Sequence, residues 1–231
     1  VEQLYTFGDR GREMPIAEST GQDRVISISY LALTPSRAVL ERATAHWRTW
    51  YDFFPWEDWR EGRPGVIDEI IAPRLRAWAQ AGDVPDTVSQ RRNRIRLAFA
   101  LDGAIWNEER ALDRYELLYE AGLAPEASDH RRILATAIGR LRAKIKYRPV
   151  VFELAPEQFT LLYLQRVVEA IAGLELHKQN FRRLLDRTGL VEGTGQVDAS
   201  AGGRPAELFR ARRETLSARP VGGIHVPAPR G

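Results

Sequence analysis

Cysteine is absent from this chain of 231 residues, methionine occurs once and histidine four times. The absence of cysteine excludes disulfide bonds, thiolate metal sites and cysteine nucleophiles, and it is compatible with a reducing cytoplasm. The histidines are scattered without the spacing of metal ligands. They are His46, His130, His177 and His225. We therefore expect no metal, no cofactor and no catalytic residue.

Long apolar runs are also lacking. None approaches the length that spans a membrane, and no secretory signal opens the chain, so the predicted location is the cytoplasm. The formal net charge is only +3 at a pI of about 9.4, which does not imply a general polyanion-binding coat. The length allows two domains. Because the chain starts at Val1 in a strand-like run, we expect that a preceding N-terminal part is missing.

The most informative region runs from Phe159 to Gly189 and predicts two short helices joined by a tight turn. The Thr160 hydroxyl can cap the first helix by accepting a backbone N–H. Gly173 and Gly189 are expected to end the two helices, because glycine tolerates the left-handed conformation. Apolar residues recur in the first helix at intervals of three and four, as one buried stripe requires. They are Leu161, Leu164, Val167, Val168 and Ile171.

The second helix concentrates basic and amide side chains on one face. Phe181, Leu184 and Leu185 serve its core side. Residues 178–187 hold four cations and one acid, whereas 154–214 as a whole holds nine basic and eight acidic residues. Arginine, asparagine and glutamine can read base edges, and lysine and arginine neutralise phosphate. The pattern predicts a DNA-recognition helix; a solvated basic helix in an ordinary helical domain is the alternative.

A two-stranded wing is expected to follow. Short β-like runs at 190–192 and 206–210 flank a Gly- and Ser-containing loop. Arg204, beside Gly203 and Pro205, sits where a wing residue could reach the DNA backbone or minor groove. The order helix, turn, helix, hairpin favours nucleic-acid binding. The predicted DNA-binding residues are Thr160, Lys178, Gln179, Asn180, Arg182, Arg183, Arg187 and Arg204.

The N-terminal part reads as strands followed by an aromatic tract. Residues 2–8 and 24–33 alternate as strands do, and a polar loop separates them. The tract from Trp47 to Trp59 contains four of the six tryptophans. Such density predicts a core wedge or an interface, and a stacking site for a base or nucleotide is the alternative.

Helices are predicted across the middle of the chain. Pro73 should kink or split the first, Asp86 can cap the second and Asn107 the third. The second helix carries a basic cluster that we expect to be solvated or to touch phosphate: Arg91, Arg92, Arg94 and Arg96. The predicted helices cover 66–81, 86–100, 107–122 and 128–148. The Pro- and Gly-rich residues 215–231 are predicted to form a flexible tail.

Several motifs occur in an order that resembles one family. They are Tyr5-Thr-Phe-Gly-Asp9, the strand 24–33, the helix 129–144, Phe159-Thr160, Leu164-Gln165, Asn180-Phe-Arg-Arg183 and Gly203-Arg-Pro205. Together they resemble the Nudix-related transcriptional regulators of NAD metabolism, in which a Nudix-like α/β domain precedes a winged helix. Trp56–Trp59 and Tyr115–Leu123 resemble the proteobacterial branch that regulates NAD biosynthesis. The resemblance covers most of residues 1–213.

The resemblance implies an α+β chain with two domains. Residues 1–153 would form a partial Nudix-like α/β domain, without its N-terminal part and Nudix box, and with a helical insertion at about 60–128. Residues 154–214 would form a winged helix-turn-helix domain. The nearest approach to a Nudix box is Tyr115–Leu123, which has tyrosines at two positions that need charged residues. We interpret it as a structural helix ended by Gly122.

The function implied is a sequence-specific transcriptional regulator, a repressor of NAD biosynthesis or salvage genes. It would bind double-stranded operator DNA as a homodimer, under the control of an adenine-nucleotide or NAD-related effector. Arg10 and Arg12 could meet the effector's phosphates, and Trp56 could stack on its base. Two alternatives are open: a Nudix hydrolase of nucleoside diphosphate derivatives such as ADP-ribose with an accessory winged helix, and a winged-helix module that binds protein.

Overall fold

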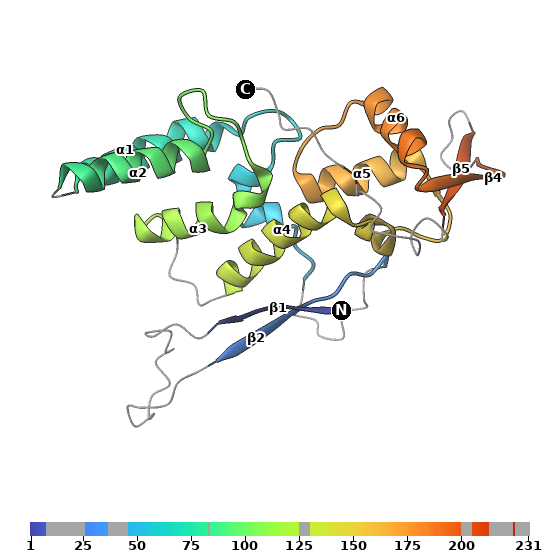
Figure 1. The fold of residues 1–231 in the computed structure, drawn as a ribbon, viewed down its shortest axis with the longest axis horizontal. Coiled ribbons are helices and arrows are strands. Elements are labelled where there is room, and N and C mark those ends of the chain that lie inside the picture. Colours follow the sequence, from blue (N-terminus) through green and yellow to red (C-terminus); the bar gives the residue numbers. More distant parts are fainter. Residues whose placement is uncertain are drawn as a thin grey trace. The chain divides into compact units, whose positions relative to one another are not determined.

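The computed structural model describes residues 1–7, 26–36, 46–82, 84–124, 130–199, 205–212 and 224. Helices and strands are mixed, which confirms the α+β class (Figure 1). The chain divides into two compact units. Unit 1 comprises Val1–Ala32 and Gly65–Arg140, and unit 2 comprises Leu33–Pro64 and Leu141–Arg230. No helix in these described ranges is long and apolar enough to cross a membrane.

Unit 1 begins with the two predicted strands. β1 (Glu2–Phe7) pairs antiparallel with β2 (Ser27–Leu31), with Thr6 opposite Ile28 and an irregularity between Gln3 and Tyr5. Leu4 is buried, and its carbonyl accepts a hydrogen bond from Arg140 at 3.2 Å. Arg140 belongs to α4 (His130–Tyr147), so this bond ties β1 to that helix.

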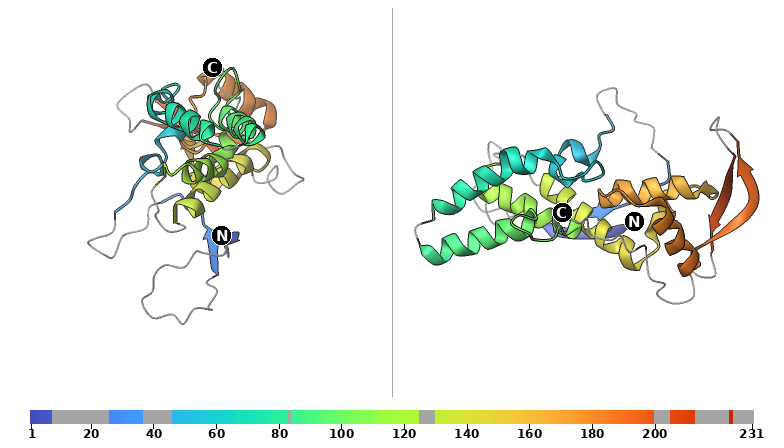
Figure 2. Two further views of the ribbon diagram at one scale, coloured as in Figure 1. Left: turned by 90° about the vertical axis from the view of Figure 1, so that its left-hand side faces the viewer. Right: turned by 90° about the horizontal axis from the view of Figure 1, so that it is seen from above.

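The helices of unit 1 follow the predicted order. A π-helical turn (Ile67–Ile71) precedes α1 (Ala72–Gln80), which packs side by side with α2 (Pro85–Ala98) (Figure 2). The wide turn ends at Ile71, two residues before Pro73, because proline lacks the N–H and its ring collides with a regular preceding turn. This confirms the predicted interruption.

Of the two caps predicted for the next helices, one is wrong and one is confirmed. Val84 is the N-cap of α2 and Pro85 takes its first position, so the predicted Asp86 cap is wrong: Asp86 lies inside the first turn. Asn107 does cap, because its Oδ1 accepts the Glu109 N–H at 2.9 Å. That bond starts a 3-10 turn (Glu108–Arg110) that leads into α3 (Ala111–Glu120).

The segment nearest to a Nudix box is mostly helical, as predicted. Tyr115 is buried in α3, and Gly122 follows the helix with a φ of +66°. Glu116 forms an ion pair with Arg132 at 2.5 Å, and Glu120 forms one with Arg94 at 2.6 Å. The two carboxylates are thus held by arginines of different helices.

Unit 2 contains a helix-turn-helix followed by a hairpin. The sheet order is β3-β5-β4, with both neighbouring pairs antiparallel. Figure 1 shows the hairpin after α6. The elements are a 3-10 helix (Val150–Leu154), β3 (Phe159–Thr160), α5 (Leu161–Ala172), α6 (Lys178–Thr188), β4 (Val191–Asp198) and β5 (Ala206–Ala211).

The wing is larger than the sequence predicts. β3 adds a third strand, with Phe159 opposite Phe209. β4 runs to Asp198, well beyond 192, because a register shift between Gly193 and Val197 absorbs residues that do not alternate. Gly195 has a φ of +75° within this shift, which a residue with a Cβ rarely adopts.

The aromatic tract packs within unit 2, on the C-terminal end of α5. Tyr51, Phe54 and Trp59 are buried, which agrees with the predicted core wedge, whereas Trp47 is exposed. The backbone N–H of Trp59 donates to the Gly173 carbonyl at 2.7 Å. The compact units therefore do not follow the predicted boundary between residues 153 and 154.

The predicted flexible tail has one described residue, Ile224. Its side chain is buried, and its N–H donates to the Ile145 carbonyl of α4 at 2.6 Å. At this residue the chain is packed, in contrast to the prediction.

Arg142 and Glu57 form a fully buried ion pair in unit 2, each with 0% of its side chain exposed. Removing one partner of such a pair leaves an uncompensated charge in a medium of low dielectric constant. Glu57→Gln should lower the free energy of unfolding by about 3–5 kcal/mol. Asp52→Asn is the matched control, because Asp52 pairs with the exposed Arg48, and should cost less than about 1 kcal/mol. Urea unfolding measures both; equal effects would contradict the prediction.

Candidate nucleic-acid interface

α5 begins and runs as predicted. Thr160 is the last residue of β3 and also the N-cap of α5, where its Oγ1 accepts the Tyr163 N–H at 3.1 Å. The hydroxyl keeps its own proton, which it can donate to a phosphate oxygen. Leu164, Val168 and Ile171 of the apolar stripe are buried, so the stripe faces the core of unit 2.

The turn between α5 and α6 is held by two side chains that sequence reasoning missed. Gln165 is buried, and its Nε2 donates to the Leu176 carbonyl at 2.8 Å and to Glu169 at 2.9 Å. Glu169 also accepts the Leu176 N–H at 3.0 Å. A polar pair four residues apart beside the apolar stripe was the available signal. These bonds fix where the chain enters α6.

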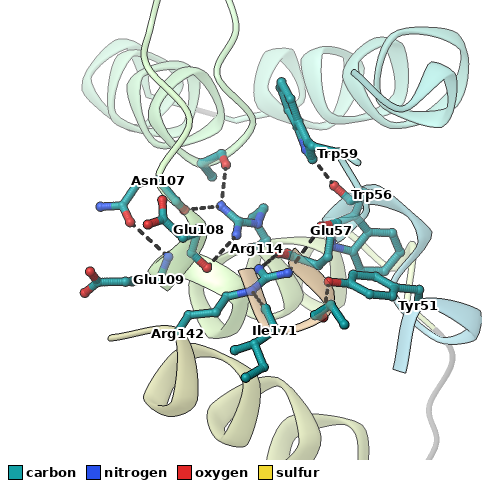
Figure 3. Close-up of polar contacts among 12 residues, drawn as sticks. Tyr51, Trp56, Glu57, Trp59, Asn107, Glu108, Glu109, Arg114, Arg142 and Ile171 are labelled. Atoms are coloured by element: carbon teal, nitrogen blue, oxygen red, sulfur yellow. Dashed lines mark hydrogen bonds and ion pairs between the residues drawn. The ribbon is translucent and has the colours of Figure 1, made fainter. Parts of the chain in front are cut away.

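The C-terminal end of α5 is capped from outside the helix. The last carbonyls of an α-helix have no partner within it and carry the negative end of its dipole. Here Tyr51 donates its hydroxyl to the Ala170 carbonyl at 2.8 Å, and the Arg142 Nε donates to the Ile171 carbonyl at 2.9 Å (Figure 3). Gly173 has a φ of +72° and ends the helix as predicted.

The charges of this cap are set by burial and by each other. Burial disfavours a charged Arg142, but the carboxylate of Glu57 and the hydroxyl of Tyr51 outweigh it and raise the pKa of Arg142 above its ordinary value. The guanidinium therefore stays charged. Burial raises the pKa of Tyr51, although Arg142 opposes this, so the phenol stays neutral and can donate.

α6 presents the polar face that the sequence predicts. Phe181 and Leu185 are buried, and Leu184 is half-buried. All six predicted recognition residues of the helix are exposed: Lys178, Gln179, Asn180, Arg182, Arg183 and Arg187. Within the part of the chain that the structure describes, no side chain of the six forms a hydrogen bond or an ion pair.

The period of the helix orders this face. Gln179, Arg183 and Asp186 lie opposite the buried side, since they are three and four residues apart. The N-cap residue of α6 is His177, and its side chain accepts no hydrogen bond from the first turn of the helix. Its free N–H groups and the positive end of the helix dipole suit an anion such as phosphate.

The base of the wing is closed by polar contacts. Arg210 pairs with Glu192 at 2.7 Å and Arg212 with the same carboxylate at 3.6 Å. Thr194 donates its hydroxyl to the Leu208 carbonyl at 2.9 Å. The tip, with the predicted DNA-binding Arg204, lies outside the described residues.

The predicted effector residues are only partly described. Arg10 and Arg12 lie outside the described ranges. The Trp56 ring is half-buried and packs edge to face on Phe54, with ring centroids 5.6 Å apart. Its carbonyl accepts the Trp59 indole N–H at 3.1 Å. Stacking of Trp56 on a base stays a prediction.

A capped first helix, a fixed turn, an exposed basic second helix and a three-stranded wing together form a winged helix. Residues 151–211 match the family model of the NrtR DNA-binding winged helix domain. This match confirms the predicted helix-turn-helix and wing.

The chain is also similar to individual proteins. It is 43% identical over 84 residues to the ADPR responsive transcriptional repressor NtrR of Acinetobacter baylyi, which is 36% of this chain and 33% of that protein. The chain thus spans about a third of this relative's length. The structure of Shewanella oneidensis NrtR with a 27mer DNA has 20% identity and a TM-score of 0.46, covering 97% of this chain and 69% of that one. A further structure of Shewanella oneidensis NrtR has 32% identity and a TM-score of 0.36, covering 46% and 48%.

Two glycines test the packing of the turn, because both have positive φ but different surroundings. Gly189 faces open space, so Gly189→Ala should cost only the left-handed strain of about 1–2 kcal/mol. A Cβ on Gly173 would overlap the Glu57 carbonyl oxygen. Gly173→Ala should therefore cost about 1–3 kcal/mol more. Thermal unfolding of the two variants decides this, and the same loss in both would mean that the turn can yield.

Proposed function

We propose that the protein is a sequence-specific transcriptional repressor of NAD biosynthesis or salvage genes. The observation that carries the proposal is the exposed basic and amide face of α6, within a segment that matches a DNA-binding winged helix. Because these cations have no side-chain partner among the described residues, no ion pair within those residues has to break before they reach DNA. Such a protein works where the DNA is, in the cytoplasm of a bacterial cell.

The arrangement suits insertion of α6 into the major groove. The groove admits one helix, and residues near its N-terminus contact base edges. We assign base reading to Gln179, Asn180 and Arg183, whose side chains can form paired hydrogen bonds with adenine or guanine. Lys178, Arg182 and Arg187 would neutralise phosphates, as would Thr160 and the wing residue Arg204.

We propose that an adenine-nucleotide or NAD-related ligand controls this binding. The relative from Acinetobacter baylyi is named as ADPR responsive, which supports ADP-ribose as the first candidate. Arg10, Arg12 and Trp56 are the proposed contacts. Control rather than hydrolysis is favoured by the same name, which describes a responsive repressor.

A homodimer would double the footprint of one winged helix. Two recognition helices related by a two-fold axis would meet half-sites about one helical turn apart, or a multiple of that. The effector would then act by its different affinity for two dimer geometries. We therefore propose an approximately palindromic operator.

Substitutions on α6 test DNA reading. Asn180→Ala and Arg183→Ala should each weaken operator binding by about 1–3 kcal/mol and relax discrimination between base pairs. Lys178→Ala should weaken operator and scrambled duplexes alike and lower the salt slope by about one. Fluorescence anisotropy at several salt concentrations, with a footprinted promoter fragment and a scrambled duplex, measures both effects.

The matched control is Arg74→Ala, which removes the same charge from an exposed position on α1. It should leave both affinities unchanged. If the folded double variant Asn180→Ala/Arg183→Ala kept the operator affinity of the unmodified protein, α6 would not be the reading helix.

ADP-ribose tests control against catalysis. Added to the protein, it should change the operator affinity about 5- to 150-fold, the usual range of coupling between two sites. Chromatography after incubation with magnesium or manganese should recover it intact. Sustained metal-dependent turnover by purified protein would favour the hydrolase instead.

A further inference from the structure

A cleft in unit 1 gathers three arginines of α1 and α2. Its volume is about 500 Å³. Its polar lining consists of Arg76, Gln80, Arg92, Asn93, Arg96 and Asp102. Three guanidinium groups against one carboxylate give the lining a formal charge of +2. Guanidinium groups bind phosphate oxygens through paired, charge-assisted hydrogen bonds.

The arginines of the cleft are only partly engaged. Arg76 pairs with Asp102 at 3.2 Å, and both side chains are more than half exposed. Arg96 donates to the Asn93 Oδ1 at 3.2 Å. Arg92, one turn before Arg96, is exposed, and its side chain forms no hydrogen bond or ion pair with any residue that the structure describes. Donors for an anion are thus available.

The other arginines of the α2 basic cluster have structural duties. Arg91 lies over the Trp78 ring, 4.1 Å from its centroid, and donates to the Trp78 carbonyl at 3.2 Å. Arg94 pairs with Asp113 and Glu120. The cluster therefore divides into two arginines that tie helices together and two that face the cleft.

The backbone beside the cleft is built to hold its shape. Ala100 and Asp102 both have a φ of +50°, which costs residues with a Cβ about 1 kcal/mol or more each. Hydrogen bonds from Leu101 to the Arg96 carbonyl and from Ala104 to the Leu101 carbonyl, both 3.0 Å, hold this turn. Strained residues that the surrounding structure fixes are frequent at ligand sites. The cleft has an apolar floor, since Ile95 and Leu101 are buried, and an apolar wall strengthens the field of the charges.

We propose that this cleft binds a small phosphate-bearing anion, held by Arg76, Arg92 and Arg96. Calorimetric titration with inorganic pyrophosphate at constant ionic strength tests it. The double variant Arg92→Ala/Arg96→Ala should bind at least about tenfold more weakly, because two charge-assisted bonds are lost. Arg74→Ala should bind within about twofold of the unmodified protein, because Arg74 is an exposed arginine of α1 outside the cleft lining.

Asp102→Asn gives a second test that does not depend on losing contacts. Asparagine accepts positive φ at least as well as aspartate, and its neutral amide frees Arg76 for the anion. This variant should bind pyrophosphate more tightly.

Absence of pyrophosphate binding to the unmodified protein would overturn the proposal, as would equal affinities in all variants. If pyrophosphate did not bind but the double variant lost affinity for duplex DNA, the phosphates would belong to nucleic acid and the proposal would be wrong.

Discussion

The capping of the carbonyl end of α5 is the interaction on which the arrangement of unit 2 depends. Helix ends leave carbonyls that water or a side chain must satisfy, and here Tyr51 and Arg142 satisfy two of them inside the protein. Trp59 takes a third, the carbonyl of Gly173, through its backbone N–H. α6 begins five residues after Gly173, so these bonds hold the chain in place shortly before that helix starts.

This cap is made by residues that are distant in the sequence, and unit 2 is accordingly built from two separate segments of the chain. Glu57 and Arg142 are 85 positions apart, yet their buried pair joins the aromatic tract to the end of α4. Residues 65–140 of unit 1 thus stand in the sequence between two segments of unit 2. A buried pair is weak support for stability by itself, because desolvation offsets its attraction. Arg142 also donates hydrogen bonds to the Ile171 carbonyl of α5 and to the Glu57 backbone carbonyl. An apolar pair could not form these directional bonds.

Local signals were sufficient for the order of the helices and for most of their caps. Thr160, Asn107 and the two terminal glycines act within a few residues of where they stand, so their roles can be read from spacing. β3 has only two residues and forms because β5 pairs with it. Two residues are too few to show the alternation that predicts a strand. Asp86 fits a cap by type, but Pro85 before it claims the first helical position. In the sequence, Arg142 looks like a solvated arginine of a basic helix, because its partner Glu57 lies 85 positions away.

The chain has 34 lysines and arginines and a net charge of +3. These numbers do not locate a polyanion-binding surface, because an arginine can instead bond to groups within the fold. Arg114 is fully buried and donates to the carbonyls of Ala98 and Asn107. Arg94 would have to give up two carboxylates to meet a phosphate. The cations of α6 face no such loss, since within the described ranges they have no partner and are already exposed. The absence of a competing internal partner, more than the local density of charge, distinguishes a surface that can bind DNA from one that holds the fold together.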